Sequence, residues 1–267
     1  MQKLIGQNLT YAIAEKLGHA VVTQAYDESV PFPIEAELCK QFGASRTVLR
    51  EAVKMLTAKG LLNSRPRQGT RVQSEQHWNL LDPDVLRWLM ERKFSLRLLT
   101  EFTQIRLAIE PMAAMLAATD ATAEDIEPIR HAIGRMQAAA QGEDDPLESD
   151  IAFHVAVLHA TGNRFYAQLE GVTSAALHIS IRFTNTYKGV RLADVAAHKK
   201  VLDAIAARQP QRARAAMESI LSEVLDLLGE ARTQPQRGNG AGATSARTPT
   251  PVAKHQSVVR KAATKRR

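Results

Sequence analysis

Three side chains of the kinds that ligate metals occur at helical spacing in the second half of the chain. In LESDIAFHVAVLHATG, Asp150 and His154 are one helical turn apart beside an apolar face. In ADVAAHKKVLDAIAA, His198 lies within a stripe of aliphatic residues. One carboxylate and two imidazoles directed into a helical core suit a divalent transition metal such as zinc. The alternative is a buried hydrogen-bonded network without a metal, since this spacing is common by chance.

A cation is also predicted on an apolar helix face, in the segment FTQIRLAIEPMAAMLAA. Arg106 lies there among aliphatic and aromatic residues. A buried guanidinium requires a carboxylate partner. Arg106 therefore either forms a structural ion pair with Glu110 or Asp150, or binds the carboxylate of a small effector.

Polar and cationic residues also gather at the start of the helix predicted in GASRTVLREAVKMLTAKGLL. Ser45 can cap the helix, Ser45 and Thr47 can bond phosphates, and Arg46 and Arg50 are one turn apart. A recognition helix meets the major groove with its first turns, where an arginine bound to guanine contributes about 1–3 kcal/mol of discrimination. The segment therefore predicts a DNA-reading helix; the alternative is an ordinary solvated helix start.

The elements that must position this helix are predicted within residues 1–76. Pro31 and Pro33 mark an extended approach to a helix near residues 34–41, and Gly43 permits a turn before the helix that runs to about Lys59. The segment LLNSRPRQGTRVQ predicts a hairpin with a basic tip that includes Arg67. The pattern indicates a winged helix-turn-helix DNA-binding domain.

The rest of the chain separates into two regions. Residues 77–230 carry long alanine- and leucine-rich amphipathic patterns, which predict an all-α bundle for effector binding and dimerisation. Residues 231–267 are polar and of low complexity, and we expect a disordered basic tail. The predicted fold is mainly α, and SEQHWNLLDPDVLRWL is the expected joint between the two domains.

Composition and charge narrow the class of protein. The 267 residues are 45% hydrophobic, enough for a core, and the formal charge is +7. Nine basic residues and no acidic ones lie in the tail, which leaves 26 basic and 28 acidic residues before it. A single cysteine, Cys39, argues against disulfides and cysteine-rich zinc sites. Without an apolar run of signal or membrane-spanning length, a cytoplasmic location is expected.

The N-terminal motifs resemble a known family. FPIEAELCKQFGASRTVLREAVKMLTAKGLLNSRPRQGTRV is similar to the winged helix-turn-helix of the GntR family of bacterial transcription regulators, with its Pro-x-Glu-x-Glu-Leu, Ser-Arg and Gly-Thr elements. The resemblance implies operator contacts by Arg46, Thr47, Arg50 and the wing residue Gly69. Ala36 departs from the pattern, because many members carry a DNA-contacting arginine there.

Residues 97–228 resemble the FCD effector domain of the FadR-type branch of this family. The resemblance implies metal ligation by Asp150, His154 and His198, with a fourth ligand position that is Ile220 here and so leaves an open coordination position. It also implies that Arg106 lines the effector pocket. Residues 34–39, 77–89 and 110–114 are similar to a member that regulates a sugar-acid operon, which implies an effector such as an aldonate.

The sequence thus predicts a repressor and not an enzyme: a homodimer on a palindromic operator, controlled by a small carboxylate. A metal-dependent helical enzyme built on the same three ligands is the main alternative, although no general base or nucleophile accompanies them. A nonspecific DNA-compacting protein driven by the basic tail is another, and its binding would be independent of base sequence.

Overall fold

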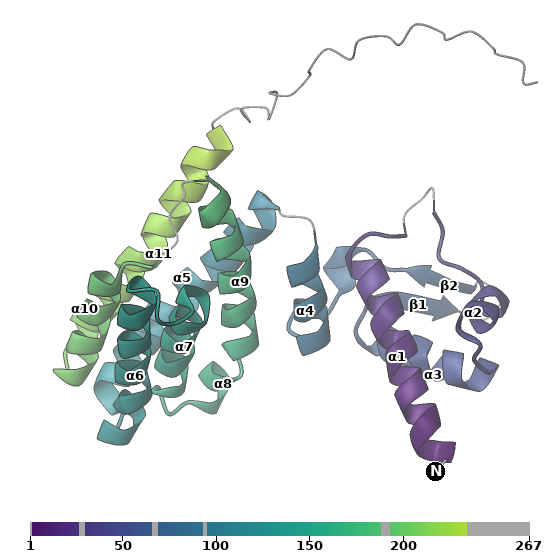
Figure 1. Cartoon of the computed structure of the whole chain (residues 1–267), viewed down its shortest axis with the longest axis horizontal. Coiled ribbons are helices and arrows are strands. Elements are labelled where there is room, and N and C mark those ends of the chain that lie inside the picture. The colour runs from purple at the N-terminus through teal and green to yellow at the C-terminus, as the bar shows by residue number, and fades with distance from the viewer. Residues whose placement is uncertain (1, 27–29, 66–68, 93–94, 188–192, 234–267) are drawn as a thin grey trace, which may run out of the picture. The chain divides into compact units, whose positions relative to one another are not determined.

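The computed structural model describes residues 2–26, 30–65, 69–92, 95–187 and 193–233, and these residues are mostly helical (Figure 1). The N-terminal elements are α1 (Gln2–Val22), α2 (Glu35–Phe42), α3 (Arg46–Ala58), β1 (Leu62–Arg65), β2 (Gly69–Val72) and the 3-10 helix η1 (Glu75–His77). The later elements are α4 (Pro83–Glu91), α5 (Leu96–Asp120), α6 (Ala123–Ala140), α7 (Pro146–His159), α8 (Arg164–Ala167), α9 (Glu170–Tyr187), α10 (Val195–Ala206) and α11 (Pro210–Thr233). Among these residues, no helix has the length and apolar character needed to cross a membrane.

The first five elements enclose one apolar core. Both α1 and α2 pack on α3, and β1 adjoins α3. Core side chains come from all of these helices and from β1, and include Ile13, Leu17, Leu38, Leu49, Leu56 and Leu62. The two strands pair as a hairpin (Figure 1). They are antiparallel, with Leu62 opposite Val72 and Arg65 opposite Gly69. This arrangement confirms the predicted helix-turn-helix and its wing.

Local signals set the start of α3. Gly43 ends α2 with a φ of 59°, a left-handed conformation that glycine adopts without a steric penalty. The Ser45 hydroxyl then accepts a hydrogen bond from the backbone N–H of Val48 at 3.3 Å, as a helix cap. The buried side chains of α3 are Leu49, Ala52 and Leu56. At the start of the same helix, Arg46, Thr47 and Arg50 are exposed to solvent.

Helix α4 contributes to two cores. Its residues Val85 and Trp88 belong to the core of the winged domain, and Trp88 Nε1 donates a hydrogen bond to Glu15 Oε1 on α1 at 2.8 Å. Leu86 packs instead with side chains of α5, α9 and α11. Trp78 is buried in the winged-domain core as well. The segment in which we predicted the joint therefore touches both domains.

Helices α5, α6, α7, α10 and α11 share a larger core, in which α5 packs along α11, α6 beside α7, and α10 beside α11 (Figure 1). Many of the buried residues are small, among them Ala113, Ala114, Ala117, Ala118, Ala132, Ala156 and Ala204. Small side chains at a contact let helices approach closely. Any polar side chain enclosed here must find a partner, because burial without one is costly.

The final helix is longer than the sequence suggested. The tail was expected to begin at residue 231, but α11 continues to Thr233, and Ala231 is buried with Leu228 against α5 and α9 residues. The amphipathic pattern therefore persists a little beyond the change in composition. The remainder of the expected tail, residues 234–267, lies outside the described residues.

Candidate metal centre and DNA-binding surface

Helix α7 carries two of the predicted metal ligands. Asp145 caps it by accepting hydrogen bonds from two backbone N–H groups of the first turn, at 2.8 and 3.0 Å, and Pro146 takes the first helical position. Asp150 and His154 follow one turn apart, and both are buried. The inward orientation predicted from their spacing is confirmed.

Helix α10 carries the third predicted metal ligand, His198. Asp194 caps this helix, and its backbone carbonyl accepts a hydrogen bond from His198 Nδ1 at 2.7 Å. A carbonyl oxygen can only accept, so Nδ1 of His198 carries a proton. The other ring nitrogen, Nε2, is the one that reaches the Asp150 carboxylate. His198 is buried, as predicted.

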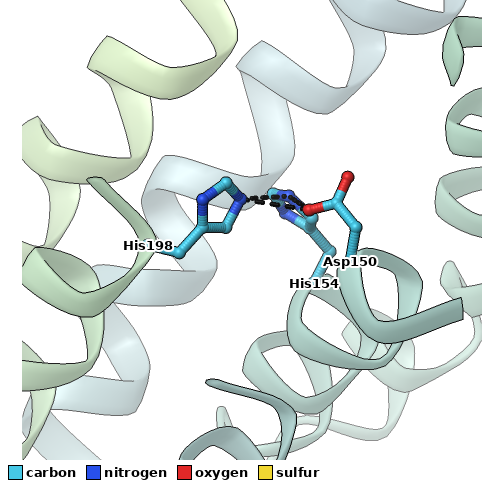
Figure 2. Close-up of side chains that lie close together, drawn as sticks. All are labelled: Asp150, His154 and His198. Atoms are coloured by element: carbon cyan, nitrogen blue, oxygen red, sulfur yellow. Dashed lines mark hydrogen bonds and ion pairs between the residues drawn. The ribbon is translucent and has the colours of Figure 1, made fainter. Parts of the chain in front are cut away.

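The three side chains converge from α7 and α10, as Figure 2 shows. Asp150 Oδ1 lies 3.1 Å from His198 Nε2 and 3.6 Å from His154 Nε2, and the two Nε2 atoms are 3.4 Å apart. Ligands bound tetrahedrally to zinc at about 2.0–2.1 Å lie about 3.3–3.4 Å from one another. The spacing of the three atoms therefore matches one face of such a coordination shell.

The hydrogen bonding of Asp150 provides a second test of fit. Oδ1 is fully buried and has no well-directed hydrogen bond, although two imidazole nitrogens lie close to it. The contact with His198 is thus a close ion pair rather than an aligned hydrogen bond. A buried oxygen without an aligned donor requires an explanation, and a bound ion is one of the usual ones. The residues fit a divalent transition metal.

Burial and neighbouring charge oppose each other in this cluster. Burial raises the pKa of Asp150, but its contact with His198 outweighs burial, and the pKa is lowered. Burial lowers the pKa of His198, yet Asp150 outweighs it and the pKa is raised. For His154 burial dominates and the pKa falls below its usual value. Asp150 is therefore a carboxylate and His154 a neutral imidazole at neutral pH, the forms in which they bind metals.

Arg106 is buried on α5, and its partner is Glu110. Its Nε donates to Glu110 Oε1 at 2.7 Å, and a terminal nitrogen donates to Oε2 at 3.3 Å. The pairing is the structural alternative that the sequence left open. The guanidinium has five N–H donors in all, so this pair does not use up its capacity.

Glu110 also joins α5 to two other helices. Oε2 lies 2.6 Å from His154 Nδ1 on α7, and Oε1 accepts a hydrogen bond from the Thr173 hydroxyl on α9 at 3.3 Å. Burial raises the pKa of Glu110, but the charge of Arg106 and the contact with His154 outweigh burial and lower it to about 2. The carboxylate is therefore ionised throughout the physiological range. The sequence offered Glu110 only as a partner for Arg106, and its contact with His154 was missed.

Ile220, at the fourth ligand position implied by the resemblance, is a partly buried residue of α11 that packs on the bundle core. An isoleucine offers no ligand atom. The metal-ligating cluster found among the described residues therefore consists of Asp150, His154 and His198.

The predicted DNA-binding residues of α3 gather at its exposed start. Ser45, Arg46, Thr47 and Arg50 are all exposed, while Leu49, Ala52 and Leu56 of the same helix are buried in the core. Exposed cations at the N-terminal turns of the second helix of this motif are positioned to reach base edges and phosphates. The structure therefore presents these four side chains together, as the sequence predicted.

One carboxylate near this surface was missed. Glu35 Oε2 accepts a hydrogen bond from Arg50 Nε at 3.1 Å, and its other oxygen lies 4.0 Å from Arg46 Nε. Glu35 opens α2, so it meets α3 only through the tertiary packing of the two helices. The Pro-x-Glu pattern located this residue in the sequence but did not indicate its partner.

The wing adds further cations. A groove of about 1450 Å³ between α3 and the hairpin is lined in part by Arg50, Lys54, Arg65 and Arg71. Gly69 begins β2 with a φ of 78°, and an added Cβ would meet nothing within 4 Å. Its backbone conformation, not crowding by neighbouring atoms, therefore favours glycine. Arg67, the predicted tip residue, lies outside the described residues.

An exposed cationic helix beside a wing, followed by a helical bundle with a buried polar centre, defines a two-domain DNA-binding protein. Residues 9–72 match the family described as bacterial regulatory proteins, gntR family, and residues 101–223 match the FCD domain. The chain belongs to the GntR family of DNA-binding transcription regulators, as the resemblance implied. Its relatives are regulators and not enzymes.

Three curated relatives illustrate the similarity. The HTH-type transcriptional regulator YieP of Escherichia coli K12 is 34% identical over 82% of this chain and 96% of its own length. The galactonate operon transcriptional repressor of the same strain is 34% identical over 74% of this chain and 87% of its own length. The regulator LutR of Bacillus subtilis 168 is 28% identical over 72% of this chain and 88% of its own length.

Proposed function

We propose that this regulator is a repressor whose operator binding is controlled by a small sugar acid, such as an aldonate, held at a divalent metal ion in the FCD domain. The observation that carries the proposal is the convergence of Asp150, His154 and His198 around a buried oxygen without an aligned hydrogen bond. The similarity to a galactonate operon repressor supports the class of effector.

The donor set favours zinc or a similar ion, with three protein ligands and an open position. A metal ion held there would supply a Lewis acid for oxygen ligands of an effector. The carboxylate and neighbouring hydroxyl of a sugar acid are such ligands. The N–H groups of Arg106 that Glu110 does not use would bind the remaining charge of the effector.

On the DNA side, we propose that Arg46 and Arg50 read base edges and that Ser45 and Thr47 bind phosphates. Arg67 and Gly69 would bring the wing against the backbone of the duplex. One winged domain offers a small interface, so a homodimer on a palindromic operator supports this function better than a monomer. Effector binding must favour one arrangement of the paired domains, and α4 contacts residues of both domains.

Thermal unfolding of the zinc-loaded protein with a panel of sugar acids tests the effector site. We expect an aldonate to raise the melting temperature of the wild type, because a ligand that binds only the folded state stabilises it. The shift should disappear in His154→Ala and in Arg106→Ala. Matched controls are His159→Ala and Arg97→Ala, which change exposed residues of the same two helices. An undiminished shift in both site variants would refute the proposed pocket.

A further inference from the structure

Glu110 links three helices of the bundle through its buried carboxylate. It is a fully buried carboxylate on α5 whose contacts reach Arg106 on its own helix, His154 on α7 and Thr173 on α9. Water does not reach Glu110, because its side chain is only 1% exposed. Its hydrogen-bonding state is therefore fixed by protein groups.

The chemistry of these contacts determines where the proton of His154 lies. Two nitrogens of Arg106 donate to Glu110, and the Thr173 hydroxyl donates as well, so the glutamate acts as an acceptor in each contact. A carboxylate paired in this way with a guanidinium is ionised and can only accept. An imidazole lone pair 2.6 Å from its oxygen would be repelled. The proton of a neutral His154 must therefore be on Nδ1.

The alignment of this contact is imperfect. Nδ1 of His154 has no well-directed hydrogen bond, although Glu110 Oε2 is within hydrogen-bonding distance. The short distance and the sign of the charges still distinguish the two tautomers, because only the Nδ1–H form gives an attraction. With Nδ1 protonated, Nε2 of His154 carries the lone pair. This atom lies 3.6 Å from Asp150 Oδ1 and 3.4 Å from His198 Nε2.

We propose that Glu110 is a positioning residue for the candidate metal centre, which fixes the tautomer and ring orientation of His154 so that Nε2 is available as a ligand. The inference rests on the proposed function of this centre. A carboxylate that orients a ligating histidine in this way typically changes metal affinity by about 10–100-fold when mutated. Arg106 then acts on the centre through Glu110, in addition to any contact with an effector.

The same arrangement is found at His198 with a different acceptor. There the backbone carbonyl of Asp194 holds Nδ1, at 2.7 Å, and Nε2 again faces Asp150. Both imidazoles are thus presented by the same ring nitrogen. A side chain can be mutated whereas a backbone carbonyl cannot, so His154 is where the positioning role can be tested.

The first experiment reads the tautomer without any metal. Long-range proton–nitrogen NMR correlations of the metal-free protein, labelled with ¹⁵N-histidine and assigned with His154→Gln, should show His154 as the Nδ1–H tautomer in the wild type. In Glu110→Gln the population should shift towards Nε2–H. A wild-type His154 in the Nε2–H form would overturn the inference, even if Glu110→Gln does not fold.

The second experiment measures zinc affinity by competition with a chromophoric chelator. We expect Glu110→Gln to bind zinc about 10–100-fold more weakly than the wild type. Glu148→Gln is the control, because Glu148 is an exposed carboxylate on α7 that contacts His178. Equal affinity of wild type and Glu110→Gln would overturn the inference. If the wild type itself binds no zinc, the proposed function fails, and the tautomer measurement still decides the role of Glu110.

Discussion

Two arginine–glutamate ion pairs lie in different surroundings. In the winged domain, Arg50 and Glu35 are 3.1 Å apart with side chains 65% and 38% exposed. In the bundle, Arg106 and Glu110 are 2.7 Å apart with side chains 3% and 1% exposed. An exposed pair contributes about 0.2–1 kcal/mol and is screened by salt. Breaking a buried pair leaves an uncompensated charge, which costs about 3–5 kcal/mol.

This difference in exposure distinguishes the α3 surface, where ion-pair partners can be exchanged, from the buried cluster around Glu110, where folding fixes them. Arg50 can leave Glu35 for a phosphate or a base at little cost, so the α3 surface is suited to reversible DNA binding. The charges around Glu110 have no access to water and must stay paired. The bundle therefore holds its polar groups in one arrangement, which suits a site that must recognise a small ligand.

The largest effect is expected from Glu110→Ala. The variant leaves Arg106 buried without its carboxylate and should lower the free energy of unfolding by about 3–5 kcal/mol. Urea denaturation followed by circular dichroism measures this loss. Arg97→Ala, which breaks an exposed pair with Glu101 on the same helix, is the matched control and should unfold at nearly the same urea concentration as the wild type. A loss below about 1 kcal/mol in Glu110→Ala would contradict the expected difference between the buried and the exposed ion pairs.

Arg50→Ala should separate binding from folding. We expect operator affinity to fall by about 1–3 kcal/mol, roughly 5- to 150-fold, if Arg50 reads a base. The free energy of unfolding should stay close to that of the wild type, because the side chain is exposed. Fluorescence anisotropy with DNA from upstream of its own operon measures the first quantity, and a scrambled duplex is the control. Equal losses on both duplexes would indicate a phosphate contact instead of base reading.

A half-buried pair should give an intermediate result. Glu15 on α1 accepts two hydrogen bonds from Arg87, at 2.6 and 2.7 Å, and one from Trp88 on α4. The Arg87 hydrogen bond lowers the pKa of Glu15 below its usual value, so its contribution to stability is present above about pH 4.5 and is lost on acidification. Glu15→Gln should cost about 1 kcal/mol at pH 7, after allowance for solvent exposure.

The pH dependence checks the cause of that loss. The difference in unfolding free energy between wild type and Glu15→Gln should shrink as the pH falls below about 4.5 and through the lowered pKa of Glu15, because the wild-type carboxylate becomes protonated. Unfolding curves at a series of pH values measure it. A difference that does not change with pH would show that the charge of Glu15 is not what stabilises the contact between α1 and α4.

The smallest effect is expected from Glu35→Gln. Stability should change by less than about 1 kcal/mol, as for other exposed ion pairs. Affinity for any DNA duplex should rise slightly, by less than about five-fold, because a negative charge is removed from the proposed DNA-binding surface. Anisotropy titrations at low and moderate salt measure both specific and scrambled duplexes. Weaker binding of DNA would mean that Glu35 orients the arginines instead of competing with phosphate.

Local signals made much of the fold predictable. The cap at Ser45, the turn at Gly43 and the aliphatic face of α3 are encoded within a few residues of each other, and the hairpin follows from its turn residues. Helical periodicity also placed Asp150 and His154 on the inner face. These features depend on short-range spacing, which a sequence displays directly.

The partners of the charged residues were harder to predict. Arg106 had two candidate carboxylates, Glu110 and Asp150, and only the packing of α5 against α7 decides between them. The contact of Glu110 with His154 joins residues of two helices, and that of Glu35 with Arg50 does the same in the winged domain. Long-range pairing depends on tertiary structure, for which periodicity within one helix carries no information.

The central claim is that the cluster of Asp150, His154 and His198 controls DNA binding by α3. Operator anisotropy of the zinc-loaded protein, titrated with galactonate, tests it most directly in the wild type and in His198→Ala, with His131→Ala as a control on the exposed face of α6. We predict that galactonate weakens operator binding of the wild type and the control within the usual range of about 5- to 150-fold and leaves His198→Ala unchanged. Release of the operator to the same extent in His198→Ala would contradict the claim.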